Sequence, residues 1–234
     1  MWRTLVIIPC LNEEDALSRV LGDLPVDQEE LRVVVVDNGS TDRSAEIAGS
    51  LGAEVVTEPK RGYGAACLRG LRELEGEKLV AFLDADYSDY PEELSLLLAP
   101  LKREEADLVI GSRMLRADSR RALLLHSRIG NRLGAFLLRR LYGHRCTDLG
   151  PFRAATYEAL AGLGMQDRGF GWTVEMQAKA GIHGLRTVEV PVRYRARIGR
   201  SKISGTILGS LGASLKILFT LIRLLPQRIR TRSG

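Results

Sequence analysis

Cysteine and histidine are both scarce in this chain, which has three of each among 234 residues. The cysteines are scattered and form no CxxC pair, at Cys10, Cys67 and Cys146. Their spacing argues against a disulfide framework and a zinc site, and it fits a reducing compartment. The histidines are too few and too dispersed for a metal cluster. Proteins built on disulfides or on histidine-bound metals are therefore disfavoured.

Acidic residues are missing from the last part of the chain, because none follows Glu189. The net charge is +5, and the positive charge is concentrated in two zones. One zone spans residues 113–145, where Asp118 is the single acid. The other holds the basic residues beyond Glu189. Such zones attract phosphate groups of nucleotides, nucleic acids or lipid headgroups.

Apolar runs of strand length recur through the first half of the chain. They cover residues 5–9, 31–36, 53–57, 79–83 and 107–112. Helix-like stretches separate them, and Asn12 is the predicted N-cap of a helix that reaches about Leu24. This alternation predicts an α/β fold with a mostly parallel central sheet and helices on both faces. A hydrophobic content of 45% supports a real core.

The pattern changes after Arg113. Residues 119–145 are predicted to form a basic helical region, and residues 172–180 a further helix. Residues 186–194 alternate like a strand. Residues 195–202 form a basic loop.

Residues 203–225 are the last helix candidate. Leucine, isoleucine and phenylalanine fill its wide face, and the narrow face holds glycines, Lys216 and Arg223. The stretch is barely long enough to span a bilayer, and Lys216 lies near its middle, where charge is costly. Two interpretations stay open: a helix in the membrane interface, and a helix packed on the sheet or on a dimer partner.

The apolar run 79–83 ends abruptly in Asp84 and Asp86, with Ala85 between them. In open α/β sheets, ligands bind just beyond the carboxyl ends of the strands. Two carboxylates at that place suit a hard divalent cation, Mg²⁺ or Mn²⁺, that also holds a diphosphate. The alternative is that both aspartates cap the next helix, and the residues alone leave this choice open.

Three further polar turns end at the same edge of the predicted sheet. They are residues 9–13, 37–40 and 111–113. Polar residues belong at strand ends in any case, so each turn alone has a purely structural explanation. Together they describe a cleft with acids for a base and a metal, glycines for close approach, and Arg113 for a phosphate.

The ordered set of motifs resembles the family 2 glycosyltransferases of the GT-A fold. Within that family it is most similar to the dolichyl- or polyprenyl-phosphate hexosyltransferases. The resemblance covers nearly the whole chain and rests on residues 7–14, 36–42, 84–88, 111–113, 148–153 and 199–202. It implies an inverting transfer of a hexose from GDP-mannose or UDP-glucose to a polyprenyl phosphate.

The resemblance also implies roles for individual residues. The nucleotide pocket would be lined by Pro9, Leu11, Glu13, Val35 and Asp37, and Asp37 would accept a hydrogen bond from the base. The donor diphosphate and its Mg²⁺ or Mn²⁺ would be held by Asp84, Ala85 and Asp86, with Asp86 the expected direct ligand. A phosphate at the reaction centre would meet Arg113. The loop closing over the donor would contribute Lys202 and one of two arginines, Arg195 or Arg197.

The acceptor decides whether a general base is needed. A lipid monophosphate is already ionised near pH 7, so it can attack without one. In that case Arg113, Arg128 and Arg132 would grip the acceptor phosphate. If the acceptor is a hydroxyl group instead, Asp148 or Glu175 must remove a proton.

Two positions depart from the family pattern. Asn38 stands where the family often has aspartate, and Ser88 stands where some members place a glutamine near the metal. The serine makes a third protein ligand to the metal doubtful.

We expect residues 1–202 to form the catalytic domain, with residues 1–113 binding the nucleotide sugar and residues 114–202 facing the acceptor. Residues 203–234 are then an interfacial helix and a basic tail. The expected partners are the donor, the acceptor and a membrane surface, with no nucleic acid, and a homodimer is left open. The expected location is cytoplasmic, peripheral on the inner face of the membrane, without a leader peptide.

Three rival functions remain. A family 2 transferase could use a soluble hydroxyl acceptor. A nucleotidyltransferase would share the sheet and the metal, but its Gly-rich phosphate loop after the first strand is absent here. A non-enzymatic nucleic-acid or membrane module would explain the basic zones, but not the acidic turns.

Overall fold

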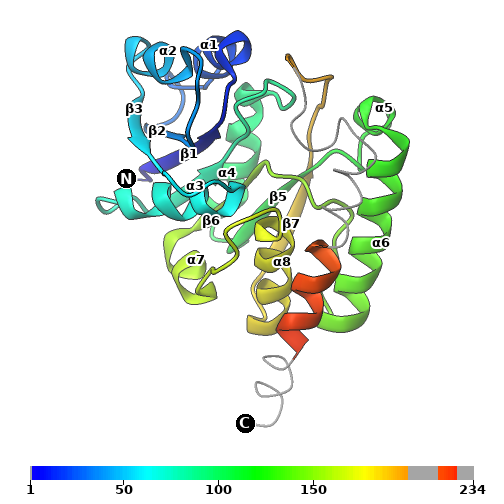
Figure 1. Cartoon of the computed structure of the whole chain (residues 1–234). Coiled ribbons are helices and arrows are strands. Elements are labelled where there is room, and N and C mark those ends of the chain that lie inside the picture. The colour runs from blue at the N-terminus through cyan, green and yellow to red at the C-terminus, as the bar shows by residue number, and fades with distance from the viewer. Residues whose placement is uncertain (1, 200–215, 226–234) are drawn as a thin grey trace.

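The computed structural model describes residues 2–199 and 216–225, and it is built on one seven-stranded sheet (Figure 1). The order across the sheet is β3-β2-β1-β4-β6-β5-β7. The strands are β1 (Thr4–Cys10), β2 (Leu31–Asp37), β3 (Glu54–Thr57), β4 (Leu79–Phe82), β5 (Leu108–Ser112), β6 (Arg153–Thr156) and β7 (Thr187–Pro191). All neighbours pair in parallel except β6, which is antiparallel to both β4 and β5. The predicted mostly parallel sheet is confirmed.

The reversed strand β6 matters for the site. Because β6 runs against its neighbours, the segment before it reaches the edge where β1, β4 and β5 end. Residues 147–152 thus lie near the acidic turn after β4. The backbone N–H of Gly111 donates to the carbonyl of Phe152 at 2.9 Å, which joins the end of β5 to the start of β6.

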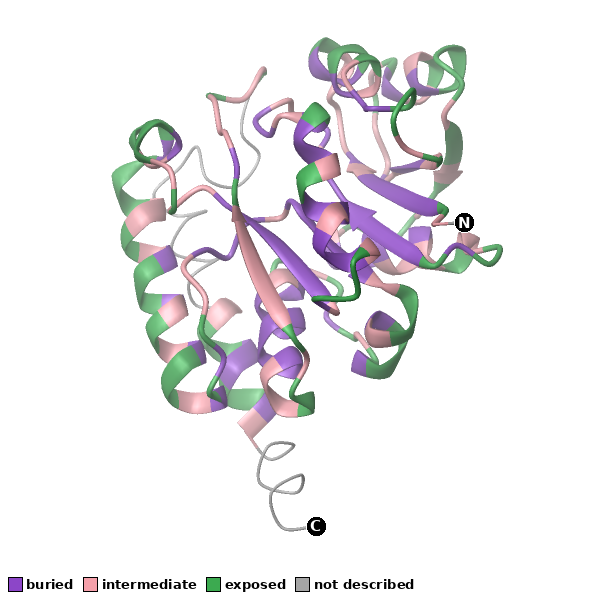
Figure 2. Ribbon diagram, turned by 180° about the vertical axis from the view of Figure 1, so that it is seen from behind, coloured by how far each residue is buried: buried purple, intermediate pink, exposed green. Residues whose placement is uncertain are grey.

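Helices cover both faces of the sheet, as the strand–helix alternation predicts. They are α1 (Glu14–Gly22), α2 (Ser44–Ser50), α3 (Tyr63–Gly70), α4 (Leu94–Lys102), α5 (Ala117–Ala122), α6 (Leu125–Tyr142), α7 (Tyr157–Leu163) and α8 (Trp172–His183). Short 3₁₀ turns lie at Leu71–Glu73 and Pro91–Glu93. Side chains of α1 and α4 pack on one face of the sheet, and side chains of α3, α7 and α8 pack on the other. Figure 2 shows the central strands buried between these layers.

A separate apolar cluster joins α6, α8 and the helix at residues 216–225. Leu138, Val174 and Leu221 are all fully buried in it, and the Tyr142 hydroxyl donates to the carbonyl of Leu221. The described part of the last helix candidate is therefore packed on the protein. Within residues 2–199 and 216–225, no helix is long and apolar enough to cross a membrane.

Two helix predictions differ from the structure. Asn12 has a φ of 52° and is not an N-cap, because α1 begins two residues later. Its side-chain oxygen instead accepts a hydrogen bond from the backbone N–H of Thr41 at 2.7 Å, which joins the first two turns. The basic region is split into α5 and α6, since Leu123 and Leu124 adopt extended backbone conformations between them.

Candidate active site

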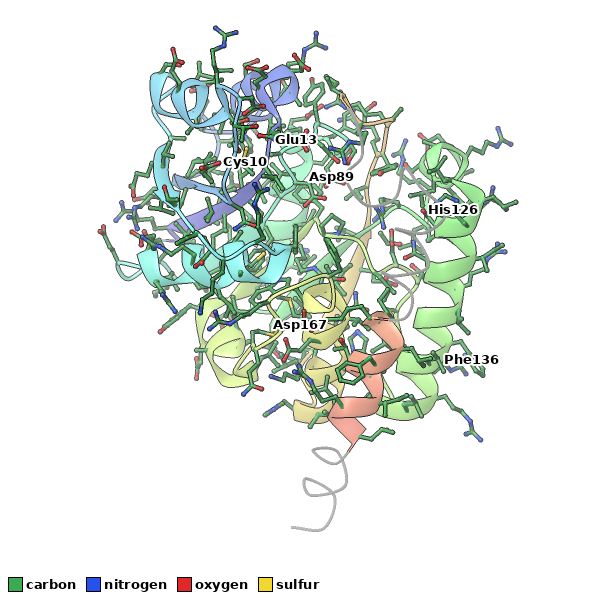
Figure 3. The ribbon with its side chains drawn as sticks, viewed as in Figure 1. Cys10, Glu13, Asp89, His126, Phe136 and Asp167 are labelled. Atoms are coloured by element: carbon green, nitrogen blue, oxygen red, sulfur yellow. The ribbon has the colours of Figure 1, made fainter. Side chains whose placement is uncertain are left out.

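The turns after β1 and β2 are fastened to each other. The backbone N–H groups of Asn12 and Glu13 donate to the hydroxyls of Ser40 and Ser44, both at 2.9 Å. Asp37 accepts from the backbone N–H of Ser40 at 3.0 Å. These bonds fix Glu13 and Asp37 at one edge of the sheet, where Figure 3 labels Glu13 and Asp89.

Asn38 has a structural role that an aspartate could not fill. Its amide nitrogen donates to the carbonyls of Glu58 and Lys60, both at 2.8 Å, and its oxygen accepts from Gly62 N–H at 2.7 Å. A carboxylate cannot donate to two carbonyls. Asn38, which stands where the family often has aspartate, therefore holds residues 58–62 against the second turn.

The acidic pair after β4 forms the centre of this edge. Asp86 accepts from the backbone N–H of Ser88 at 2.9 Å. Asp84 has one buried oxygen with no hydrogen-bond partner among the described residues. Burial and the neighbouring Asp86 carboxylate raise the pKa of Asp84. A cation bound here would relieve the repulsion between the two carboxylates.

The loop after β7 crosses directly over the acidic turn. The backbone N–H groups of Arg195 and Ile198 donate to the carbonyls of Ser88 and Asp86, both at 3.0 Å. Asp89 and Tyr194 form an isolated antiparallel bridge. The family resemblance predicts that this loop closes over the donor, and in the structure the loop lies on the acidic turn.

The two candidate arginines of this loop lie in different surroundings. The guanidinium carbon of Arg195 lies 3.3 Å and 4.0 Å from the ring centroids of Tyr87 and Tyr90. Arg195 also donates to the carbonyls of Tyr87 and Asp89. Arg195 therefore links the loop after β7 to residues 87–90. Arg197 instead points into the acidic edge, where it pairs with Glu13 at 2.6 Å and Asp86 at 3.2 Å.

Arg113 is held rigidly by Asp148. Its Nε and Nη2 donate to the two carboxylate oxygens at 2.8 Å and 2.7 Å, and Asn131 of α6 donates to the same carboxylate at 2.8 Å. Burial acts to raise the pKa of Asp148, but the Arg113 guanidinium and the hydrogen bonds outweigh it and lower that pKa. Asp148 thus stays ionised and orients Arg113 rather than accepting a proton.

Glu175, the other acid–base candidate, has a structural role. It is fully buried and accepts from the backbone N–H groups of Gln166 and Asp167. Lys179 pairs with it at 2.9 Å, on the next turn of α8. Through these hydrogen bonds, Glu175 holds the loop before α8 against the helix.

The arginines of α6 differ in exposure. Arg128 is partly buried, and its Nε is buried without a partner among the described residues. Arg132 is exposed. Arg128 remains a candidate for an anionic ligand.

The other predicted site residues are not all at this edge. Val35 is fully buried in the core under α1, so it has no exposed surface with which to line a pocket. Ala85 is also buried in that core, while Pro9 and Leu11 are partly exposed at the edge. Lys202 lies outside the residues that the structure describes.

Sequence reasoning missed the aromatic residues and Asp89. Tyr87, Tyr90 and Tyr194 stack with arginines of the loop after β7 and with Arg113. Tyr194 lies between Arg193 and Arg195 in the sequence, but nothing local says that residues 87–90 and 193–197 meet. Asp89 is 1% exposed, and neither carboxylate oxygen has a hydrogen-bond partner among the described residues.

The donor set fits a divalent cation that shares its ligands with a substrate. Asp84 and Asp86 offer carboxylate oxygens, which Mg²⁺ and Mn²⁺ prefer. In the described part of the chain, no three His, Cys, Asp or Glu side chains are grouped so as to hold a metal on their own. Mg²⁺ is commonly bound by one or two carboxylates plus substrate phosphates, which is the arrangement that this edge allows.

Solved structures with a similar fold contain a divalent cation and a nucleotide. Glucosyl-3-phosphoglycerate synthase of Mycobacterium tuberculosis, solved with Mn²⁺, UDP and glucosyl-3-phosphoglycerate, is 25% identical with a TM-score of 0.73. The match covers 94% of this chain and 79% of that one. The same enzyme has also been solved with Mg²⁺ and UDP.

Sequence relatives cover most of the chain. A protein of Mycobacterium tuberculosis described as an uncharacterized glycosyltransferase is 40% identical over 90% of this chain and 94% of its own. An undecaprenyl-phosphate mannosyltransferase of Micrococcus luteus is 34% identical over 88% and 90%. Polyprenol monophosphomannose synthase of Mycolicibacterium smegmatis is 31% identical over 87% and 82%. The family model named glycosyl transferase family 2 matches residues 5–161. With a family match over more than half of its length and these relatives, the chain belongs to glycosyl transferase family 2.

Proposed function

We propose that this chain transfers a hexose from a nucleotide-diphospho-sugar to a polyprenyl phosphate at a membrane surface, with inversion at the anomeric carbon. Two relatives named for polyprenyl-phosphate mannose transfer support this acceptor. The donor is GDP-mannose or UDP-glucose. The observation that carries the choice of a lipid acceptor is the outer surface of α6.

The outer surface of α6 is apolar and basic. Leu125, Ile129, Leu133 and Phe136 recur at helical spacing and are 66%, 58%, 58% and 60% exposed. Figure 3 labels Phe136 and His126 on this helix, at the rim of the molecule. Exposed arginines accompany the apolar residues, and the helix contains no acid. Such a surface fits the headgroup and acyl boundary of an anionic bilayer.

The same helix reaches the reaction centre. Asn131 lies on its buried side and donates to Asp148, which holds Arg113. A membrane bound by the outer surface of α6 would lie across this helix from Arg113, which keeps Arg113 close to the headgroups of that membrane. Arg113 recognises a phosphate through a guanidinium that Asp148 keeps in one orientation.

The chemistry needs charge neutralisation more than proton transfer. A divalent cation bound at Asp86 would stabilise the negative charge that builds on the leaving diphosphate. Arg197 adds positive charge at the same place. The acceptor phosphate is already ionised near pH 7, so neither Asp148 nor Glu175 has to act as a base. Attack from the face opposite the diphosphate inverts the anomeric carbon.

The test is an acceptor panel. The full chain is incubated with labelled GDP-mannose or UDP-glucose, Mn²⁺ and either polyprenyl phosphate in vesicles or soluble 3-phosphoglycerate. The second acceptor is included because a solved neighbour is named for it. We expect labelled lipid with the inverted anomer. Label on 3-phosphoglycerate alone, or retention of configuration, would contradict the proposal.

A vesicle-binding experiment tests the membrane surface by itself. We expect the triple variant Ile129→Ser, Leu133→Ser, Phe136→Ser to bind phosphatidylglycerol vesicles at least about tenfold more weakly than the unmodified chain. The matched control is Leu51→Ser with Leu96→Ser, which changes exposed leucines on α4 and after α2. Equal binding by both variants would remove the support that α6 gives to a lipid acceptor.

A further inference from the structure

Arg197 lies between two carboxylates of the acidic edge. Its Nη2 is 2.6 Å from Glu13 Oε1, and its Nη1 is 3.2 Å from Asp86 Oδ2. All three side chains are largely buried, with exposed fractions of 24%, 11% and 14% for Arg197, Glu13 and Asp86. One guanidinium thus balances acids from the turns after β1 and β4. Asp86 is also the carboxylate that is expected to bind the metal.

The backbone around Arg197 is fixed, so its side chain is the part that can change partners. The N–H of Ile198 donates to the carbonyl of Asp86, and the N–H of Arg195 donates to Ser88. The Arg195 side chain is stacked between Tyr87 and Tyr90, which secures the same loop. Arg197 lies between these two anchors.

We propose that Arg197 is an internal counter-ion that occupies Asp86 in the free protein and gives it up when a divalent cation and a nucleoside diphosphate bind together. This inference rests on the metal site of the proposed function. A cation at Asp86 and the guanidinium at 3.2 Å from it would repel each other, so binding of metal alone is opposed. A diphosphate supplies new oxygens to which the displaced guanidinium can donate.

The consequence is coupling between metal and nucleotide. A metal that arrives alone has to displace Arg197 from Asp86 without a new partner for the guanidinium. A metal that arrives with a diphosphate displaces it onto phosphate oxygens. Each ligand therefore raises the affinity of the other, and the coupling is reciprocal. Glu13, which pairs with the other guanidinium nitrogen, keeps Arg197 within reach of the site.

The experiment measures Mn²⁺ binding rather than turnover. The electron paramagnetic resonance signal of free Mn²⁺ is followed as the full chain is added, without nucleotide and then with UDP or GDP. We expect Arg197→Gln to bind Mn²⁺ alone at least about tenfold more tightly than the unmodified chain, because the competing charge is gone. The gain in Mn²⁺ affinity that UDP or GDP brings is expected to shrink in this variant.

Two controls isolate the cause. Arg193→Gln removes the same charge from the same loop, but Arg193 pairs with Glu92 and Glu93 instead of Asp86. We expect its Mn²⁺ affinity to stay within about twofold of the unmodified chain. Arg197→Lys keeps the charge and should bind Mn²⁺ alone as weakly as the unmodified chain, so tighter binding in this variant would contradict a charge effect. If the glutamine variant does not fold, Arg197→Met removes the same charge and is expected to show the same gain in Mn²⁺ affinity.

The outcomes separate this inference from the proposed function. If Asp86→Asn abolishes Mn²⁺ binding and Arg197→Gln leaves it unchanged or weakens it, the metal site stands and the counter-ion role of Arg197 is overturned. If Asp86→Asn binds Mn²⁺ as the unmodified chain does, the metal is not at Asp86, and both the proposed metal site and this inference are overturned.

Discussion

Two sets of buried carboxylates in this molecule have opposite surroundings. Beside the site, on β6, α8 and the segments next to them, each is fully paired: Asp148 binds Arg113 and Asn131, and Glu175 binds Lys179 and two backbone N–H groups. After β4, oxygens of Asp84 and Asp89 are buried without hydrogen-bond partners among the described residues. Since an unpaired buried polar atom is costly, the second arrangement is expected where a ligand completes the set. Asp148 and Glu175 stabilise the fold through their partners, and the unpaired oxygens of Asp84 and Asp89 point to a ligand site.

The strongest test of this contrast is Asp148→Asn. Losing one partner leaves the Arg113 charge largely buried, with its side chain 12% exposed. We expect a loss of about 3–5 kcal/mol in the free energy of unfolding, measured by urea denaturation. Asp118→Asn is the matched control, because its pair with Arg116 is exposed and its loss should leave the free energy of unfolding nearly unchanged. Similar losses in both variants would break the comparison.

Asp86→Asn should show the converse behaviour. We expect turnover with the labelled donor to fall by about 100- to 1000-fold, because the cation that would neutralise the diphosphate loses its expected carboxylate ligand. Stability should change little, since Asp86 keeps its contact with Ser88 N–H through an amide oxygen. Urea denaturation of the variant distinguishes a loss of activity from a loss of folding.

A pH titration of stability extends the comparison from the buried acids to a buried base, His144. Burial, with a smaller contribution from the Arg153 charge, lowers the pKa of His144 from 6.5 to about 4. The His144 imidazole is therefore protonated below about pH 6.5 in the unfolded chain, but only below about pH 4 in the folded chain. Stability from this group is intact above pH 6.5 and falls by on the order of 3 kcal/mol as pH drops to about 4. His144→Asn should remove that part of the slope between pH 7 and pH 5.

The smallest effect is expected at Arg195. Arg195→Lys keeps the charge but weakens the stacking on Tyr87 and Tyr90, which should cost about 1 kcal/mol of stability. The affinity for UDP or GDP with Mn²⁺ should stay close to that of the unmodified chain. A large loss of nucleotide affinity would show that Arg195 contacts the donor and would erase its distinction from Arg197.

Strand-end residues were predictable from the sequence, because a buried run followed by a polar turn fixes their position locally. Asp84, Asp86 and Arg113 are at the predicted edge for this reason. The burial of Val35 was not predictable in this way, because it depends on α1 packing over the sheet. The choice between Arg195 and Arg197 depends on where two loops more than 100 residues apart meet, which no local pattern encodes.

The reversed direction of β6 has one more consequence. Residues 113–152 leave the sheet at the end of β5 and return beside it, because β5 and β6 are antiparallel neighbours. A segment that leaves and re-enters the sheet at neighbouring strands can change in length without shifting the strands that flank it. The turns after β1, β2 and β4 lie on other strands and would keep their positions. Changes in the exposed parts of α5 and α6 can thus accumulate without moving β1, β2 and β4.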